Sequence, residues 1–315
     1  MKYRRPATAR VTSARMPTRI IRRFARRAGP VAPPRGPRLF VSSLRLAVFL
    51  AALASLADWR PRHPVRTARE AAIESGEPGP EWKVEPGFRH DVFTFARIQY
   101  TPGRWGWRGS GQWWIDFPDS DLNLSFRLQQ LTSLRVDPDG RVLRLTDPDL
   151  FHYPWIYIVE PGELRFEEEE VSALRRYLLN GGFLMFDDFW GEDEWNNLEQ
   201  QMKRVFPDRA FVELPLDHPI YSCVFPIRAK GQVPNVRTGI ESQFDGVTWE
   251  RWDAKEVHHR ALLDDKGRIL AIACHNTDNG DGWEREAWSD YYFHNFSEKI
   301  AYPLGINIIF YAMTH

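Results

Sequence analysis

The sequence has little cysteine and contains none of the short motifs that most often identify a catalytic class. It carries two cysteines in 315 residues, and it has no G-x-S-x-G, H-E-x-x-H or C-x-x-C pattern and no Walker loop. Serine hydrolases, zincins, thioredoxin-like proteins and nucleotidases therefore lose their usual sequence support. Cys223 and Cys274 could form one disulfide in an oxidising compartment, but the pattern favours two separate buried thiols.

Acidic residues are missing from the first 45 positions, which hold 13 lysines and arginines. The other 270 residues hold the remaining 29 basic residues and all 42 acidic ones, a net charge of −13. Because nucleic-acid binding needs clustered Lys and Arg side chains, we do not expect this acidic part to bind nucleic acid. Its charge suits a soluble domain, a cationic ligand or a bound metal ion.

The apolar stretch that follows the basic segment, Leu46–Leu56, is short. A membrane span needs about 20 apolar residues, whereas a stretch of this length followed by small residues is typical of a signal peptide. We predict that residues 1–57 form a targeting segment, either a cleavable signal or an uncleaved anchor. The rest of the chain would then be exported, periplasmic, or anchored to the cytoplasmic membrane facing outward, with membrane contact only through this segment.

Residues 58–91 are rich in proline, glycine and charge, and they are predicted to form a linker with one short helix near residues 68–74. Beyond them, apolar strands alternate with helices. Strands are expected at residues 92–100, 142–148, 155–159, 183–186, 210–214 and 268–274, a short extended piece at 114–118, and helices at 119–131, 166–180, 194–205 and 304–313. We expect residues 92–315 to form one doubly wound α/β domain, flavodoxin-like or amidotransferase-like, with a mostly parallel sheet sandwiched by helices.

Polar residues follow two of the buried strands. The run GGFLMF ends in Asp187 and Asp188, and the run ILAIAC is followed by His275, Asn276 and Asp278. The carboxyl ends of parallel strands form the edge at which ligands bind. Successive strand side chains point to opposite faces, so both aspartates reach one ligand only if the chain turns there.

This pattern suggests two kinds of chemistry. Asp187, Asp188 and His275 are candidate acid–base catalysts, and Asp187, Asp188 and Asp278 are candidate ligands of a divalent metal. The alternative is that these side chains only cap helices and support Asx turns.

A loop rich in tryptophan and glycine, GRWGWRGSGQWW, is a second candidate site. Trp105 or Trp107 could stack on a sugar or another flat ligand, and Arg104 or Arg108 could bind a carboxylate or phosphate. The alternative is a loop folded over the sheet edge with its tryptophans packed inward.

Three other residues are candidate ligand contacts. Asp116 and Asp121 lie close together in WIDFPDSD, and Trp190 follows the twin aspartates. Asp119 or Ser120 is expected to cap the helix that follows.

Several segments together resemble a known family. They are FTFARIQY, WWIDFPDSDLNLSFRLQQLTSLRV, LFHYPWIYIVEPG, LRRYLLNGGFLMFDDFWG and LPLDHPIYSCVF, and in this order they are similar to the bacterial domain of unknown function 4159 over residues 92–313. The resemblance implies an exported or membrane-attached domain like those of class I glutamine amidotransferases. It implies no activity. The G-x-C-x-G nucleophile elbow is missing, and Cys274 is followed by His275 and Asn276, so glutaminase chemistry is not expected.

Two functions fit these observations. The favoured one is a ligand-binding or assembly module of the cell envelope that binds a small molecule or an envelope polymer without turnover. The alternative is a hydrolase that uses the acidic residues around a divalent metal. The two differ in whether the polar atoms of Asp187, Asp188, His275 and Asp278 converge within about 5 Å.

Overall fold

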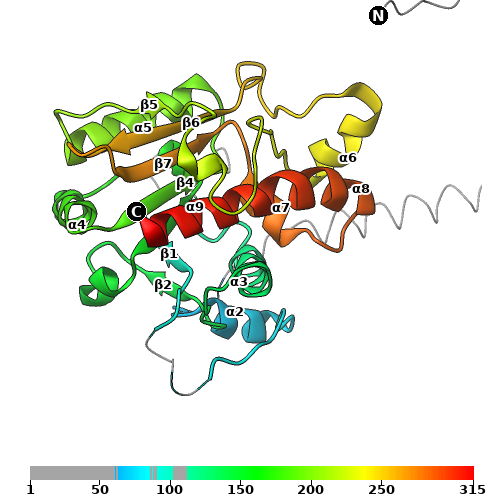
Figure 1. Ribbon diagram of the computed structural model, residues 1–315, viewed down its shortest axis with the longest axis horizontal. Helices are drawn as coiled ribbons and strands as arrows, with labels where there is room; N and C mark the ends of the chain where they lie inside the picture. Colours follow the sequence, from blue (N-terminus) through cyan, green and yellow to red (C-terminus); the bar gives the residue numbers. More distant parts are fainter. Residues whose placement is uncertain (1–60, 62, 86, 88–90, 102–111) are drawn as a thin grey trace, which may run out of the picture. The chain divides into compact units, whose positions relative to one another are not determined.

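Seven strands form one sheet with helices on both of its faces (Figure 1). The computed structural model describes residues 61, 63–85, 87, 91–101 and 112–315. The strands are β1 (Ala96–Ile98), β2 (Arg141–Leu143), β3 (Trp155–Val159), β4 (Phe183–Asp187), β5 (Val212–Glu213), β6 (His258–Leu263) and β7 (Ile269–His275). The α-helices are α2 (Ala68–Ser75), α3 (Asp119–Leu131), α4 (Glu168–Leu179), α5 (Gly191–Val205), α6 (Val236–Asp245), α7 (Asn279–Glu284), α8 (Asp290–Tyr292) and α9 (Tyr302–Thr314). The short 3-10 helices are η3 (Pro148–His152), η4 (Pro161–Glu163) and η5 (Pro219–Tyr221), and η6 (Phe293–Ala301) is a π-helix.

The strand order is β2-β1-β3-β4-β7-β6-β5. Strands β2, β1, β3, β4 and β7 are parallel to one another, whereas β6 and β5 are antiparallel additions at one edge. The predicted mostly parallel α/β sheet is therefore confirmed. The order β2-β1-β3-β4 is that of a doubly wound sheet, in which ligands bind beyond the carboxyl ends of the strands near the switch between β1 and β3.

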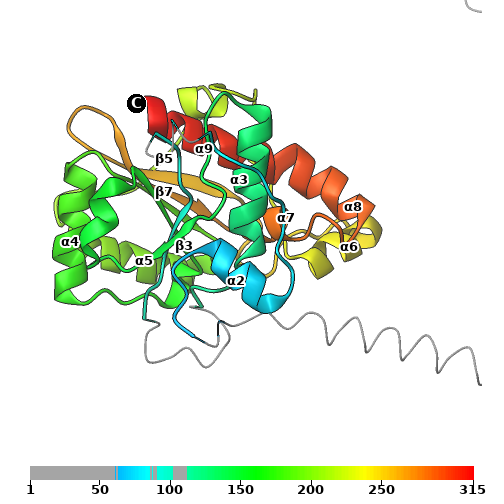
Figure 2. The same ribbon diagram turned by 90° about the horizontal axis from the view of Figure 1, so that it is seen from below.

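The strands in the middle of the sheet are buried on both faces. Every residue of β3, β4 and β7 is buried, as expected for strands covered by helices on both sides. Alternate side chains enter two separate cores: α2, α4 and α5 contribute to one, and α7 and α9 to the other. Figure 2 shows α4 and α5 on one side of the sheet and α9 on the other.

Helix α4 shows why the local sequence folds as it does. Its first turn holds three glutamates, and Glu167 and Glu170 form a reciprocal capping box with the free backbone N–H groups. Val171, Leu174 and Leu178 are buried, as their spacing predicted. The helix is followed by Gly181 with φ 103°, a left-handed conformation that glycine adopts without strain.

Some predicted elements differ from the structure around the antiparallel edge. The strand expected at residues 210–214 is only Val212–Glu213, an exposed strand antiparallel to β6, and not part of a parallel crossover. Strand β6 itself was not predicted from the sequence. Its His259 is fully covered, although HH in a polar stretch had no apolar pattern to indicate a strand.

One helix prediction also needs correction. Pro118, not Asp119 or Ser120, is the N-cap residue of α3, and no side chain caps the helix there. Leu131 at its other end is half exposed. Pro303 lies in the first turn of α9, and α9 continues directly from the π-helix η6.

The segment predicted as a linker contains a helix that packs into the domain core. Ala68, Ala71 and Ala72 of α2 are fully buried, and Arg69 donates to the carbonyl oxygens of Pro80 and Pro138. Small side chains let the helix lie close to the sheet. The predicted extended piece at residues 114–118 is a series of turns leading into α3.

Several predictions concern residues outside the described part of the chain. These are the targeting segment at residues 1–57 and the candidate ligand contacts Arg104, Trp105, Trp107 and Arg108. Within the described part, no helix is long and apolar enough to cross a membrane. Cys223 and Cys274 are free thiols.

Candidate metal-binding site

The chain turns sharply where β4 and β7 end. Asp188 follows β4 with φ 54°, and Asn276 follows β7 with φ 62°. Left-handed backbone of this kind is uncommon for residues other than glycine, and it reverses the strand direction. Beyond the two turns, Phe189 and Thr277 form an antiparallel bridge, and the Asp188 N–H donates to the Thr277 carbonyl at 3.2 Å. The turn holds Asp188 beside the segment that carries Asp278.

A third aspartate reaches the same place from the turn before α3. Asp116 also has a left-handed backbone, with φ 61°. The turn is held by Arg97 of β1, whose Nη1 donates to the carbonyl oxygens of Trp113 and Ile115 at 3.0 and 3.1 Å. Asp116, Asp188 and Asp278 are all buried and each offers a carboxylate oxygen within 4.8 Å of the other two. We call these three residues the aspartate triad.

Gly280 makes room for this arrangement. A Cβ atom at position 280 would stand 2.1 Å from Asp116 Oδ2 and 3.3 Å from the Tyr157 hydroxyl. Such a distance to a carboxylate oxygen is far shorter than any normal contact. A side chain at position 280 would therefore displace Asp116 from the triad.

Asp187, although adjacent to Asp188, has a different role. Its Oδ1 accepts from Asn279 Nδ2 at 2.7 Å, and its Oδ2 accepts from the Tyr157 hydroxyl at 3.0 Å and the Gly280 N–H at 3.1 Å. Burial raises the pKa of Asp187 to about 7, against the lowering effect of these hydrogen bonds. The side chain fixes the start of α7, and with it the segment that follows Asp278.

The carboxyl groups of the triad lie in a strongly negative electrostatic environment. Burial first, and then repulsion from Glu160 and Glu250, raises the pKa of Asp188 well above its usual range. Burial and repulsion from Asp188 do the same to Asp278. Buried carboxylates this close together need either a proton or a cation to offset their repulsion.

Trp190 orients Asp188. Its Nε1 donates to Asp188 Oδ1 at 2.9 Å, and its side chain is almost fully buried. A buried indole N–H normally finds such a partner. Trp190 thus lies next to the triad as a hydrogen-bond donor, with little ring surface exposed for stacking a ligand.

Asp121 has a structural role. Arg97 Nη2 lies 2.5 Å from Asp121 Oδ1, and Arg97 Nε donates to both carboxylate oxygens. Both side chains are buried, so each charge is neutralised by the other. The Arg97 guanidinium also lies 5.0 Å from the ring centre of Tyr157. Asp121 therefore lies outside the triad.

His275 lies on the other face of the sheet. Its Nε2 is 3.0 Å from the Gly191 carbonyl, its Nδ1 is 3.1 Å from Arg260 Nη1, and its ring stacks on Phe189. Burial lowers the pKa of His275 to about 4. Since alternate residues of β7 face opposite sides, Cys274 lies in the core with Asp187 while His275 packs toward α5. His275 does not join the triad.

Two residues of this region, Glu160 and Arg97, were not singled out from the sequence. Glu160 follows β3 in the left-handed conformation, and the rule applied to Asp187 and Asp278 would have selected it. Arg97 was detectable as a charge inside an otherwise apolar strand, which needs a buried partner. Asn279 belongs to the polar loop after β7, and its fully buried side chain has an Oδ1 atom that accepts no hydrogen bond from the described residues.

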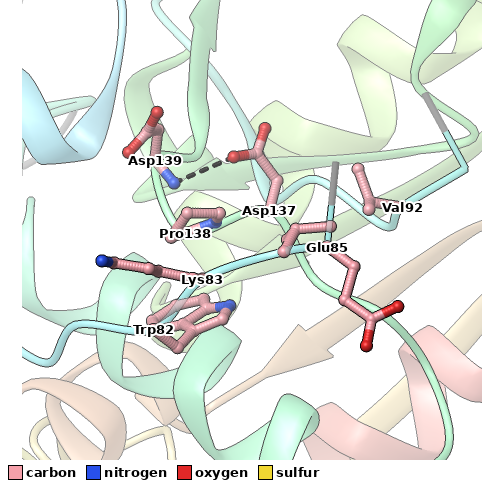
Figure 3. Close-up of a pocket in the computed structure, with 8 residues that line it drawn as sticks. Trp82, Lys83, Glu85, Val92, Asp137, Pro138 and Asp139 are labelled. Carbon is pink, nitrogen blue, oxygen red and sulfur yellow. Dashed lines mark hydrogen bonds between the residues drawn. The ribbon is translucent and has the colours of Figure 1, made fainter. Parts of the chain in front are cut away.

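The cavity drawn in Figure 3 lies elsewhere. It has a volume of about 690 Å³ and is lined by Trp82, Lys83, Val84, Glu85, Val92, Asp137, Pro138 and Asp139. The Trp82 indole donates to the Val136 carbonyl, just before β2, so this cavity is at the amino end of the strands. Lys83 and Glu85 point in different directions in Figure 3. It is separate from the triad at the carboxyl end.

A comparison with known families gave one match. Residues 94–313 match the model of the family described as domain of unknown function (DUF4159). The match covers more than half of the chain and includes all seven strands and the whole triad, so the chain belongs to this family. The comparison with curated proteins found no match.

Proposed function

We propose that this domain binds a divalent cation through Asp116, Asp188 and Asp278. The observation that carries the proposal is that three buried carboxylates from separate segments lie within 4.8 Å of one another. Oxygen ligands of this kind suit hard cations such as Mg²⁺, Ca²⁺ or Mn²⁺. The buried amide oxygen of Asn279, which accepts no hydrogen bond from the described residues, is a further ligand of the right chemistry in the same region.

The cation would serve a binding function. Three carboxylates fill only part of the coordination shell of Mg²⁺ or Ca²⁺, which takes six to eight oxygens. The open positions can accept anionic or hydroxyl oxygens of a ligand, such as a small molecule or an envelope polymer. We therefore propose a ligand-binding or assembly module of the bacterial cell envelope, exported or anchored through residues 1–57. The basic start and the apolar stretch Leu46–Leu56 support this location.

We further propose that the fold is related to class I glutamine-amidotransferase-like domains but lacks their chemistry. The support is the strand order and the position of Cys274 at the end of β7. Burial raises the pKa of the Cys274 thiol well above its usual range, whereas a nucleophilic cysteine needs a lowered pKa.

A metal-dependent hydrolase is the second candidate. A bound cation can also lower the pKa of a coordinated water, which then attacks a substrate. The observation that favours it is that Glu160 and Glu250 lie near enough to Asp188 to raise its pKa, so two further carboxylates that could accept a proton are close to the triad. Cation-dependent hydrolysis of ester or phosphoester probes that Glu250→Gln abolishes, with cation binding intact, would favour this candidate.

Thermal unfolding of the full chain tests the cation proposal. The protein is treated with EDTA and melted alone and with Mg²⁺, Ca²⁺ or Mn²⁺. A ligand at 100 times its Kd stabilises the folded state by about 2.7 kcal/mol, which is a clear shift in Tm. Asp188→Asn should remove the shift and the exposed Asp265→Asn should retain it. No shift with any of the three cations would reject the proposal.

A further inference from the structure

The carboxyl edge of the sheet holds a second group of acids that shares one residue with the triad. Asp116, Asp281 and Glu284 also offer carboxylate oxygens within 4.8 Å of one another. Asp281 and Glu284 both belong to α7, one turn apart, and their side chains are less than 10% exposed. Two adjacent acid groups with a shared carboxylate are the usual arrangement of a two-metal centre, where the ions lie about 3.5–4 Å apart.

The two groups differ in one respect. Arg285 Nε lies 2.5 Å from Glu284 Oε2 and 3.5 Å from Asp281 Oδ1, so the second group already contains a cation. In the described residues, no lysine or arginine forms an ion pair with Asp188 or Asp278 of the triad. A guanidinium cannot lose its proton in a protein, so its charge is permanent.

The Arg285 side chain is also held in place. It is 12% exposed, and its guanidinium lies 4.8 Å from the ring centre of Trp288. Asp281 is fixed from its other oxygen, because Oδ2 accepts from the Val236 N–H at 2.6 Å. A metal ion in the second group would have to displace a cation that is stacked, partly buried and ion-paired with two carboxylates.

We propose that Arg285 is a built-in counter-cation that limits this edge to one divalent ion, and that its removal opens a second metal site sharing Asp116. The inference rests on the proposed function, since it assumes that the triad binds the first ion. The charge of Arg285 then restricts this edge to one metal ion, although its carboxylates would suit two ions. A ligand would then be held by a single cation, and the two-metal clamp typical of many phosphoryl-transfer enzymes would not form.

The number of bound Mn²⁺ ions tests this inference. Calorimetric titration of the chelator-treated full chain should give one site for the wild type and two sites for Arg285→Gln. Arg285→Lys keeps the charge and should bind one ion. The exposed Arg237→Gln, which breaks a surface pair with Glu241, is the control and should also bind one. The double variant R285Q/E284Q should return to one, which would locate the second ion.

The outcomes separate the two proposals. One site in both the wild type and Arg285→Gln would overturn the role of Arg285 and leave the triad proposal intact. Two sites in the wild type would also overturn the role of Arg285. No binding to the wild type would reject the triad itself. Arg285→Met, a replacement of similar length, is measured in parallel, and circular dichroism checks that both variants fold. A single site in every folded variant overturns the inference.

Discussion

Asp116 lies against Gly280, so closely that a Cβ atom at position 280 would stand 2.1 Å from Asp116 Oδ2. The two residues are far apart in the sequence, one in the turn before α3 and one in α7. The Gly280 N–H also donates to Asp187. The lack of a side chain at this position is therefore what lets three carboxylates meet.

Gly280→Ala should abolish cation binding while leaving the chain folded. The added methyl group displaces Asp116 from the triad, and the strain should lower the free energy of unfolding by about 1–3 kcal/mol. Gly87→Ala is the matched control, because a Cβ there meets no atom within 4 Å. Thermal melts with and without Mn²⁺ check both effects. Unchanged cation binding in Gly280→Ala would show that Asp116 is not a ligand.

Asp187→Ala should weaken cation binding without abolishing it. Residues that orient metal ligands typically contribute 10–100-fold to affinity. Removal of this carboxylate leaves Tyr157, Asn279 and Gly280 without their acceptor, which should also cost about 1–3 kcal/mol of stability. Calorimetric titration compares the variant with Asp188→Ala, which should not bind. Equal losses in both variants would mean that Asp187 is itself a ligand.

Asp187→Asn should lower the stability of the fold less than Asp187→Ala does. The new amide can still accept from Tyr157 and Gly280 through its oxygen. Asn279 can then rotate its own amide and accept with Oδ1, the atom that has no partner among the described residues. Urea unfolding measures the difference, and a loss of stability in Asp187→Asn as large as in the alanine variant would contradict this account of Asn279.

Trp190→Phe should reduce cation affinity by about tenfold, because Asp188 loses the donor that fixes its rotamer. Phenylalanine keeps most of the buried ring, so the fold should be retained. Trp252→Phe is the control, since that side chain is 84% exposed. The apparent Kd for Mn²⁺ measures the effect, and equal affinities in the two variants would remove Trp190 from the site.

Arg97→Met should destabilise the protein by about 3–5 kcal/mol, because it leaves the Asp121 carboxylate buried without its partner. The double variant Arg97→Met/Asp121→Leu should recover much of this loss, since neither charge is then buried alone. Urea unfolding provides the free energies. If the double variant is less stable than Arg97→Met, the pair is not the main contribution of Arg97.

Acid should lower the free energy of unfolding, because His259 is buried in its neutral form. Its Nδ1 lies 3.0 Å from the Tyr221 hydroxyl, and burial lowers the pKa of His259 to about 3, with Lys230 and His258 adding repulsion. In the unfolded chain His259 binds a proton near pH 6.5, and in the folded chain it does not. The contribution of neutral His259 to the free energy of unfolding is therefore complete above pH 6.5. It is lost by about 1.4 kcal/mol per pH unit as the pH falls from 6.5 toward 3.

His259→Gln tests this dependence, because glutamine can keep a bond to Tyr221 but does not titrate. The stability difference between wild type and variant should shrink below pH 6.5, as followed by urea unfolding at several pH values. A difference that stays constant from pH 7 to pH 4.5 would contradict a neutral, buried His259.

The parallel part of the fold was predictable because its strands are apolar on both faces. The run Trp155–Val159 is short and consists of β-branched and aromatic residues, which indicates a buried strand, and the spacing of Val171, Leu174 and Leu178 indicates a helix. The antiparallel edge was not predictable in this way. Strand β6 contains His259 and Arg260, whose burial depends on partners far away in the sequence.

The site was predictable only in part. The strand-end rule selected Asp188 and Asp278, which do come together, and also Asp187, which supports them. Asp116 belongs to a turn before α3, and its meeting with Gly280 depends on tertiary packing that no local pattern reveals. His275 was grouped with the aspartates because it lies at the end of the same strand, close to Asp278 in the sequence. The alternation of side chains along β7 directs it to the other face of the sheet.

The most direct test is a crystal structure of the full chain with Mn²⁺, using its anomalous scattering. The account predicts one anomalous peak, bound by oxygens of Asp116, Asp188 and Asp278 at about 2.0–2.6 Å, with Arg285 still paired to Glu284. A peak bound by other residues, or none among these three carboxylates at saturating Mn²⁺, would contradict it.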